Sequence, residues 1–154
     1  MDMRRLDRTV ETAEALSYLH EATVGYLALA DNNTAYTLPL HFVWRDQSIY
    51  FHCAPEGRKI TLLRQNPHCS FVVSFLDGIK GGASACEYGA YYRSAIVDGV
   101  ARFVVDTEEK LMALTALTEK HAQAPFLPVT AAGMAKTTVV AIDIVRISGK
   151  ARRS

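Results

Sequence analysis

The sequence predicts a mainly β fold of the α+β class, a six-stranded antiparallel β-barrel with flanking helices. Short apolar segments rich in β-branched and aromatic residues follow one another through short polar turns, which is typical of antiparallel hairpins. Few helical segments separate them, whereas a doubly wound parallel sheet needs a helix in nearly every connection. The chain has 154 residues, of which 49% are hydrophobic, enough for one domain with its own core. We therefore expect residues 1–154 to form a single domain.

The N-terminal part is expected to contain one helix and two strands. Apolar residues at three-residue spacing predict a helix over 9–22, which Thr9 can cap. Strands are predicted over 24–30 and 35–44, joined by a turn rich in Asp and Asn. Pro39 interrupts the second strand. Because proline cannot donate to the ladder, this strand should lie at an edge or carry a bulge.

The rest of the chain is expected to alternate strands with two further helices. Asp106 and Glu109 have the spacing of a capping box and predict the start of the last helix. Glycines in 77–84 and prolines in 122–134 predict irregular loops, and the basic segment 148–154 is expected to be a mobile tail. The remaining expected elements are strands at 48–52, 69–75, 91–105 (bent at Gly99) and 138–147, and helices at 58–65 and from 106 to about 121.

Composition excludes several classes of protein. The formal net charge of +1 argues against nucleic-acid binding, because that class relies on a basic field. No apolar run approaches the roughly 20 residues that span a membrane, and no signal peptide is evident. The three cysteines, Cys53, Cys69 and Cys86, form no C-x-x-C pair, so we expect reduced thiols and a cytoplasmic protein.

The segment from Tyr50 to Ile60, YFHCAPEGRKI, is the strongest candidate for a binding site. A strand ends in a Pro-Glu-Gly loop, and Arg58 and Lys59 begin a helix directly after Gly57. Two cations at a helix start are unfavourable for the helix itself, because that end of the macrodipole is already positive. Together with the free backbone N–H groups, they form a suitable phosphate site. The alternative is that both are ordinary solvated surface charges.

Histidine and cysteine positions do not predict a metal site. Two His-Cys pairs occur, at 52–53 and 68–69, and adjacent side chains of a strand point to opposite faces. Each pair can then supply one ligand to a common site, which is too few for closed zinc coordination. His41 and His121 are expected to be structural, whereas His52 stands at a strand end beside the loop and is a candidate ligand contact.

Three tyrosines, Tyr88, Tyr91 and Tyr92, precede Arg93 and Ser94. The favoured interpretation is that the rings pack at the start of a β-strand. The alternative is an aromatic wall over a flat ligand, with Arg93 and Ser94 as hydrogen-bonding groups.

Several segments, taken in order, resemble a known superfamily. MRRLDR, YTLPLHFVW, IYFHCAPEGRKI and NPHCSFVV are similar to segments of the flavin-binding split-barrel superfamily. CEYGAYYRSAIVDGVARFVVDTEEK and the terminal ISGKARR resemble its nitroimidazole-resistance-type branch, which is related to pyridoxamine phosphate oxidase. The resemblance covers nearly the whole chain.

The resemblance implies a split β-barrel and a homodimer with two FMN molecules at the subunit interface. By similarity, Gly57, Arg58 and Lys59 would hold the FMN phosphate. His52, Cys53 and Ala54 would run past the ribityl chain, the backbone of Leu38, Pro39 and Leu40 would line the isoalloxazine edge, and Ser94 would contact the flavin. Substrate residues of pyridoxamine phosphate oxidase are not recognisable, so vitamin oxidation is not implied.

Three functions remain open at this point. The first is an FMN-dependent oxidoreductase that reduces small electrophiles such as nitroaromatics, with His52 as the candidate catalytic proton donor because imidazole titrates near neutral pH. The second is a non-catalytic flavin carrier or sensor. The third is a haem-binding split-barrel protein, for which the sequence singles out no axial histidine.

Overall fold

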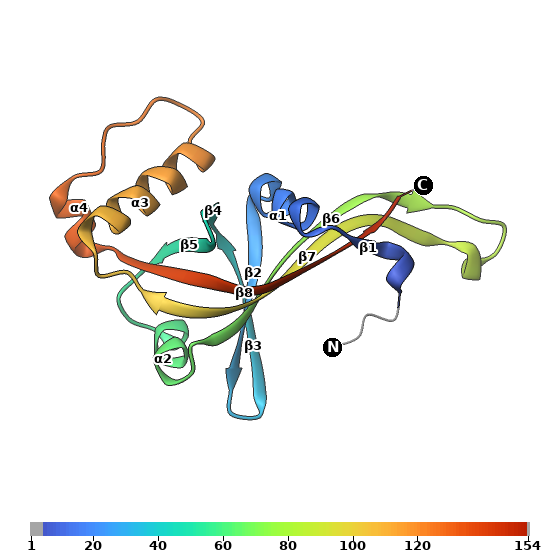
Figure 1. Ribbon diagram of the computed structural model, residues 1–154, viewed down its shortest axis with the longest axis horizontal. Coiled ribbons are helices and arrows are strands. Elements are labelled where there is room, and N and C mark those ends of the chain that lie inside the picture. The colour runs from blue at the N-terminus through green and yellow to red at the C-terminus, as the bar shows by residue number, and fades with distance from the viewer. Residues whose placement is uncertain (1–4, 154) are drawn as a thin grey trace.

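The computed structural model describes residues 5–153, in which one eight-stranded sheet is accompanied by four α-helices and two short 3-10 helices (Figure 1). In chain order the elements are η1 (Leu6–Arg8), β1 (Thr9–Val10), α1 (Thr12–Glu21), β2 (Val24–Asp31), β3 (Thr34–His41), β4 (Val43–Arg45), β5 (Ser48–Cys53), α2 (Arg58–Gln65), β6 (His68–Lys80), η2 (Ala85–Glu87), β7 (Gly89–Phe103), α3 (Thr107–His121), α4 (Ala131–Lys136) and β8 (Thr138–Arg152).

The strands follow the order β3-β2-β6-β7-β8-β5-β4, with β1 added to β8, and every pair is antiparallel. The edge strands β3 and β4 do not pair with each other, so the barrel is split. The expected fold class is confirmed, but the expected count of six strands is wrong. The segment 35–44 is divided at Phe42 into β3 and β4, and β1 is an extra short strand. Pro39 lies in edge strand β3, as its missing N–H requires.

Strand β5 is covered on both faces and separates two hydrophobic clusters. Phe51 lies in the larger cluster, inside the barrel, together with Phe71. Tyr50 lies in the smaller cluster beneath α3, together with Leu117. Four successive residues of β5, Ser48 to Phe51, are therefore buried, as expected for a strand between two layers.

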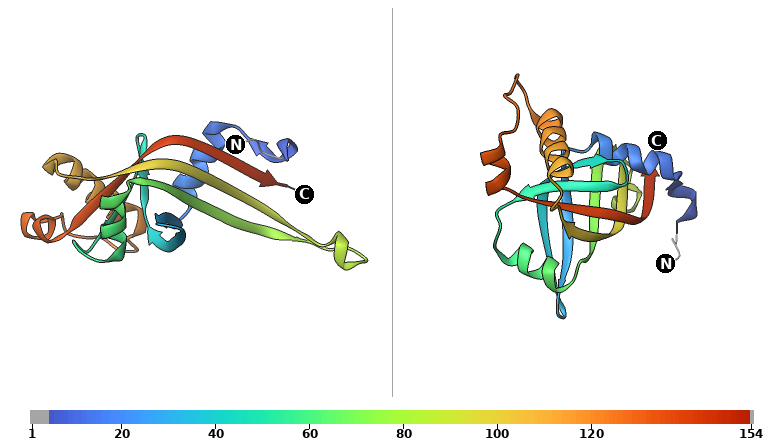
Figure 2. Two further views of the ribbon diagram at one scale, coloured as in Figure 1. Left: turned by 90° about the horizontal axis from the view of Figure 1, so that it is seen from below. Right: turned by 60° about the vertical axis from the view of Figure 1, so that its left-hand side comes forward.

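The C-terminal segment is ordered, which corrects the prediction of a mobile tail at 148–154. Strand β8 continues to Arg152, and Ala151 is buried opposite Arg93 of β7; Ser154 lies outside the described residues. Strand β6 likewise extends to Lys80, so much of the loop expected at 77–84 is strand. Both extensions arise because β7 supplies a pairing partner along their length, and the three strands form a long ribbon that projects beyond the barrel (Figure 1, Figure 2).

The structure contains one of the two predicted helix caps and an irregularity at the predicted bend. The Asp106 side chain accepts the Glu109 N–H at 2.8 Å, which confirms the predicted cap of α3. The Glu109 carboxylate does not return to the cap and instead accepts the Tyr50 hydroxyl. Thr9 belongs to β1, so the expected cap of the first helix is wrong. The predicted bend at Gly99 coincides with a shift in the β7–β8 register.

Gly149 brings β8 into close contact with α1 and generates a prediction about stability. A Cβ at this position would lie 2.5 Å from Val10 Cγ2 and 2.8 Å from Ala15 Cβ. Gly149→Ala should therefore reduce the free energy of unfolding by about 1–3 kcal/mol, the usual cost of overpacking. Urea unfolding followed by circular dichroism measures the loss. The control is Gly81→Ala, whose added Cβ meets no atom within 4 Å; equal losses in the two variants would contradict the packing explanation.

Candidate functional site

The start of α2 supplies unpaired backbone donors. Gly57 precedes the helix with φ of +116°, a conformation that favours glycine, and a Cβ placed there would meet no atom within 4 Å. Its carbonyl accepts the Thr61 N–H, so the N–H groups before Thr61 begin the helix without intrahelical acceptors. Burial of Ile60 and Leu63 against the barrel anchors the helix. The backbone geometry is therefore that of an accessible anion-binding helix start.

The two basic side chains at this helix start differ in their surroundings. Arg58 Nε and Nη2 both donate to one oxygen of Asp31, at 3.2 and 2.8 Å, and its guanidinium lies 4.5 Å from the centroid of the Tyr36 ring. Lys59 Nζ lies 5.2 Å from the centroid of Phe51 and makes no ion pair within residues 5–153. Lys59 therefore keeps an uncompensated charge, whereas Arg58 is oriented by a carboxylate that the sequence did not indicate.

The predicted ribityl segment at the end of β5 is partly accessible. His52 and Ala54 are exposed, while Cys53 is half-buried against the barrel core. Burial raises the pKa of the Cys53 thiol, and nearby Lys59 partly opposes that shift. Because the thiolate is the nucleophilic form, this shift disfavours reaction of Cys53 as a nucleophile.

Strand β3 places the predicted ring-lining residues at a sheet edge. Leu38 and Leu40 pair with Leu27 and Gly25 of β2, and their side chains pack against the barrel core. Pro39 lies on the opposite, outer face. Since β3 pairs on one side only, alternate residues keep free N–H and C=O groups that can face a ligand.

Three histidines that are distant in sequence line one pocket of about 540 Å³, which we call the histidine pocket. His41 ends β3, His52 lies in β5 and His121 ends α3. The rings of His41 and His121 meet edge to face with centroids 4.9 Å apart, and His121 Nε2 is 3.0 Å from the carbonyl oxygen of Phe42. That contact agrees with the expected structural role of His121. The sequence did not predict that His121 shares a pocket with His41 and His52, because no spacing between them indicates it.

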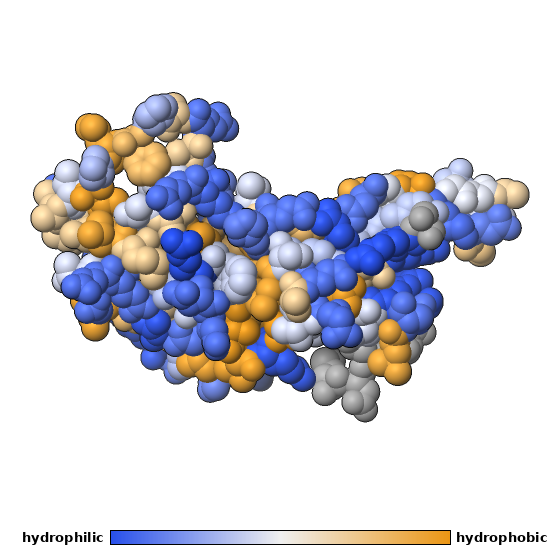
Figure 3. All heavy atoms as spheres, turned by 45° about the horizontal axis from the view of Figure 1, so that its top comes forward, coloured by the Kyte–Doolittle hydropathy of each residue, from blue (hydrophilic) through white to orange (hydrophobic). Residues whose placement is uncertain are grey.

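The rest of the histidine pocket is apolar and hydroxyl-bearing. α3 and the chain leading to α4 provide its wall, and this end of the molecule exposes apolar residues among polar ones (Figure 3). No carboxylate of residues 5–153 lines it. The wall includes Leu114, Leu117, Val129, Thr118, Thr130 and Thr137.

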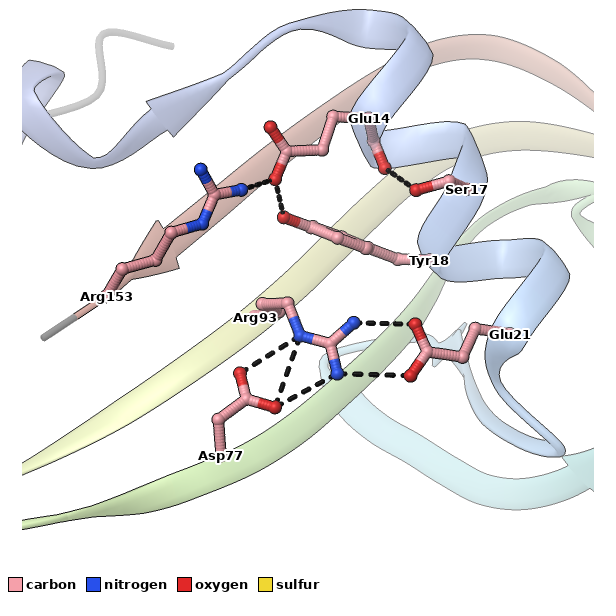
Figure 4. Close-up of polar contacts among 7 residues, drawn as sticks. All are labelled: Glu14, Ser17, Tyr18, Glu21, Asp77, Arg93 and Arg153. Atoms are coloured by element: carbon pink, nitrogen blue, oxygen red, sulfur yellow. Dashed lines mark hydrogen bonds and ion pairs between the residues drawn. The ribbon is translucent and has the colours of Figure 1, made fainter.

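Arg93 is engaged in structural contacts. It forms ion pairs with Glu21 of α1 at 2.6 Å and with Asp77 of β6 at 2.9 Å, and it lies 4.4 Å from the centroid of Phe75 (Figure 4). Beside it, Glu14 of α1 accepts from Tyr18 and from Arg153 (Figure 4). These contacts join α1 to the ribbon and occupy Arg93, whereas Tyr88 of the predicted aromatic cluster is largely exposed.

Ser94 is not brought to the start of α2 within one chain. It pairs with Ser74 and Lys150, whereas Val100 pairs with His68, which follows α2. Six residues of strand separate Ser94 from Val100, a distance of about 20 Å at roughly 3.3 Å per residue. The structure thus gathers the predicted residues of β3, β5 and α2 in one region and leaves Ser94 apart.

Residues 11–151 match the model of a protein family described as pyridoxamine 5'-phosphate oxidase. The chain belongs to this family. The family resemblance noted in the sequence is thereby confirmed. No curated protein matches the chain. Within the described residues, no group of three or more potential ligands could hold a metal ion, and no helix has the length and apolar character needed to cross a membrane.

Solved structures share the fold of this family member. A nitroimidazole antibiotic resistance protein from Bacteroides thetaiotaomicron, described as putative, is 24% identical with a TM-score of 0.79, covering 92% of this chain and 85% of that one. An FAD- and haem-binding protein from Mycobacterium smegmatis is 22% identical with a TM-score of 0.85, covering 96% and 74%. An FAD-binding protein from Mesorhizobium loti is 25% identical with a TM-score of 0.71, covering 95% and 98%.

The Arg93 contacts generate a prediction about acid stability. Hydrogen bonds from Arg93 lower the pKa of both Glu21 and Asp77. A lowered carboxyl pKa contributes stability that is present above the unfolded-state value of about 4 and is lost as pH falls through the folded-state value. Arg93→Gln should therefore lower Tm at pH 7 and flatten the decline of Tm between pH 5 and 3, as measured by thermal denaturation.

The matched control is Arg146→Gln, which removes the exposed pair between Arg146 and Asp98 at the sheet surface. It should leave the acid decline of Tm close to that of the natural chain. Parallel declines in all three proteins would show that Arg93 does not set the acid sensitivity.

Proposed function

We propose that this chain is an FMN-binding homodimeric oxidoreductase that reduces small electrophiles such as nitroaromatics. The observation that supports it best is the open, uncompensated start of α2, at Gly57 and Lys59, in a member of this family. A phosphate needs converging donors, and backbone N–H groups with a lysine supply them.

Arg58 completes the phosphate site in this proposal. Asp31 uses one oxygen for two of the guanidinium nitrogens, so Nη1 has no partner within residues 5–153 and remains available to a second anion. The contact with Tyr36 further restricts the guanidinium. A positioned arginine loses little conformational entropy when a phosphate arrives.

The remaining contacts follow from the position of β3 and β5. The free backbone groups at Leu38–Leu40 would line the ring, and His52, Cys53 and Ala54 would lie along the ribityl chain. His41 directly follows Leu40, so the histidine pocket opens next to the proposed ring position. When bound, FMN would supply the electron-transfer chemistry. The chain would supply orientation, an apolar chamber for the electrophile, and the exposed His52 imidazole as proton donor.

A homodimer would complete this site. The outer face of the sheet exposes Tyr26 and Ile96 at 46% each and Val24 at 37%, and Ser94 lies on the same face. Covering this apolar face with a second copy would protect it from water and would bring a second Ser94 toward a flavin at the interface.

Two other functions are compatible with parts of this geometry. A carrier or sensor would use the same flavin contacts without turnover. Haem binding now has a specific observation in its favour, because His41, His52 and His121 line one largely apolar pocket. The optical spectrum of the purified protein separates the flavin functions from the haem one.

FMN binding and its phosphate contacts can be tested together. The double variant Arg58→Ala/Lys59→Ala should weaken FMN binding by at least about tenfold and leave riboflavin nearly unchanged, because charge-assisted bonds to phosphate contribute roughly 1.5–3 kcal/mol each. Isothermal titration calorimetry with FMN, FAD and riboflavin measures this, and light scattering of the flavin-loaded protein should give a dimer mass.

The matched control is Arg64→Ala, at the other end of α2, which should bind FMN like the natural chain. Absence of FMN binding at high micromolar concentration would overturn the proposal. Equal losses for FMN and riboflavin would place the two basic residues away from the phosphate.

Reduction of electrophiles is tested in a separate anaerobic experiment. With the bound flavin reduced, addition of a nitroaromatic should reoxidise it faster than free FMN, and His52→Ala should slow this step by about 10²-fold if the imidazole supplies the proton. Stopped-flow absorbance follows the reaction, with His68→Ala as the control. Reoxidation no faster than for free FMN, with no effect of His52→Ala, would favour the carrier or sensor.

A further inference from the structure

Lys120, in the last turn of α3, has surroundings unusual for a lysine. Its Nζ lies 4.1 Å from the centroid of the fully buried Phe42 ring and donates to the Leu19 carbonyl of α1 at 3.1 Å. It makes no ion pair within residues 5–153. Burial lowers the pKa of Lys120 to about 8, so an appreciable fraction is neutral near physiological pH.

Lys120 also lines a pocket of about 390 Å³ between α1, β4 and α3, separate from the histidine pocket. His20 of α1 and Arg45 of β4 face the same space, and Arg45 makes no ion pair among the described residues. Trp44 lines it too and packs against the barrel core, where its indole Nε1 is buried with no hydrogen-bond partner among residues 5–153. Within the part of the chain that the structure describes, Glu119 is the one acid in the lining. The pocket therefore combines an amine with surplus donors.

We propose that Lys120 is a nucleophilic site that forms a Schiff base with small aldehydes bearing a carboxylate. A lysine in an apolar contact, lining a cleft and lacking a carboxylate partner, is the arrangement that favours amine nucleophiles. The donors of His20 and Arg45 suit the carboxylate of such a compound. This site is independent of flavin binding.

The chemistry is balanced without an oxidant or reductant. The lone pair of neutral Lys120 Nζ attacks the aldehyde carbon, and the C=O π electrons move to oxygen. The carbinolamine then loses its hydroxyl group and a nitrogen proton as water, and a C=N bond forms. Nothing is oxidised or reduced, and hydrolysis reverses the step.

A purely structural role is the main competing interpretation, since the bond from Lys120 to Leu19 joins α3 to α1. The two roles differ in a measurable way. The structural role needs only a hydrogen-bond donor at Nζ, whereas Schiff-base formation needs a neutral amine accessible from the pocket. Arginine keeps the donor and the charge but forms no such imine, so Lys120→Arg separates the two roles.

The test uses the full chain, glyoxylate as the probe, and cyanoborohydride, which reduces the imine to a stable secondary amine. At substoichiometric labelling and pH 7, peptide mapping by mass spectrometry should find Lys120 modified at least about tenfold faster than Lys110 of the same helix. An amine of pKa about 8 is neutral in about one molecule in ten at pH 7, against roughly one in 2,500 for a lysine of about 10.4. The lower intrinsic reactivity of the weaker base removes part of this advantage.

The pH profile and variants complete the test. Labelling of Lys120 should rise up to about pH 8 and level off above it, with His20, Arg45 and Glu119 as the charged neighbours that can displace the midpoint. Lys120→Arg should lose the labelled peptide, and Lys110→Arg should keep it. Acetaldehyde should label Lys120 more slowly than glyoxylate. Uniform labelling of all lysines, or a rate that keeps rising beyond pH 9, would overturn the proposal even if Lys120→Arg fails to fold.

Discussion

Phe42 links the barrel core to helix α3. Its ring is fully buried and meets Phe71 edge to face at 4.8 Å. Phe71 approaches β2 so closely that a Cβ at Gly25 would lie 2.2 Å from its ring. Phe42 itself lies between the end of β3 and the start of β4, the two edge strands of the sheet. Phe42 also contacts α3. Its carbonyl oxygen lies next to His121 Nε2, and Lys120 Nζ lies over its ring.

The position of Phe42 between α3 and the barrel core places one pocket on each side of it. The histidine pocket opens where β3 ends at His41. The pocket lined by Lys120, between α1, β4 and α3, opens where β4 follows. α3 provides a wall to both, and it is held at its first turn by Glu109, which accepts from Tyr50 and from Arg102. Packing at Phe42 and polar contacts at Glu109 therefore position opposite ends of the same helix.

Much of the fold and part of the site could be predicted from the sequence, because those features depend on local patterns. The α2 helix after Gly57 and the Asp106 cap follow from short-range chemistry, and both are present. The long ribbon could not be predicted, because residues after Ile147 become strand through pairing with β7 and β1, which are distant in sequence. The Arg58–Asp31 pair and the histidine pocket join residues from separate elements, so no spacing in the sequence predicts them.

Cysteine chemistry bears on which group could carry out the proposed reduction. Burial raises the pKa of Cys53 and raises that of Cys69 to about 11, so both are protonated at neutral pH. A protonated thiol beside the proposed flavin is a poor nucleophile toward the ring or toward a proposed electrophile in the histidine pocket. Lys59 counteracts the shift at Cys53, but a bound phosphate would neutralise that lysine and favour the thiol further. In the proposed complex, occupation of the phosphate site would thus keep Cys53 in its thiol form and leave the electron chemistry to the cofactor.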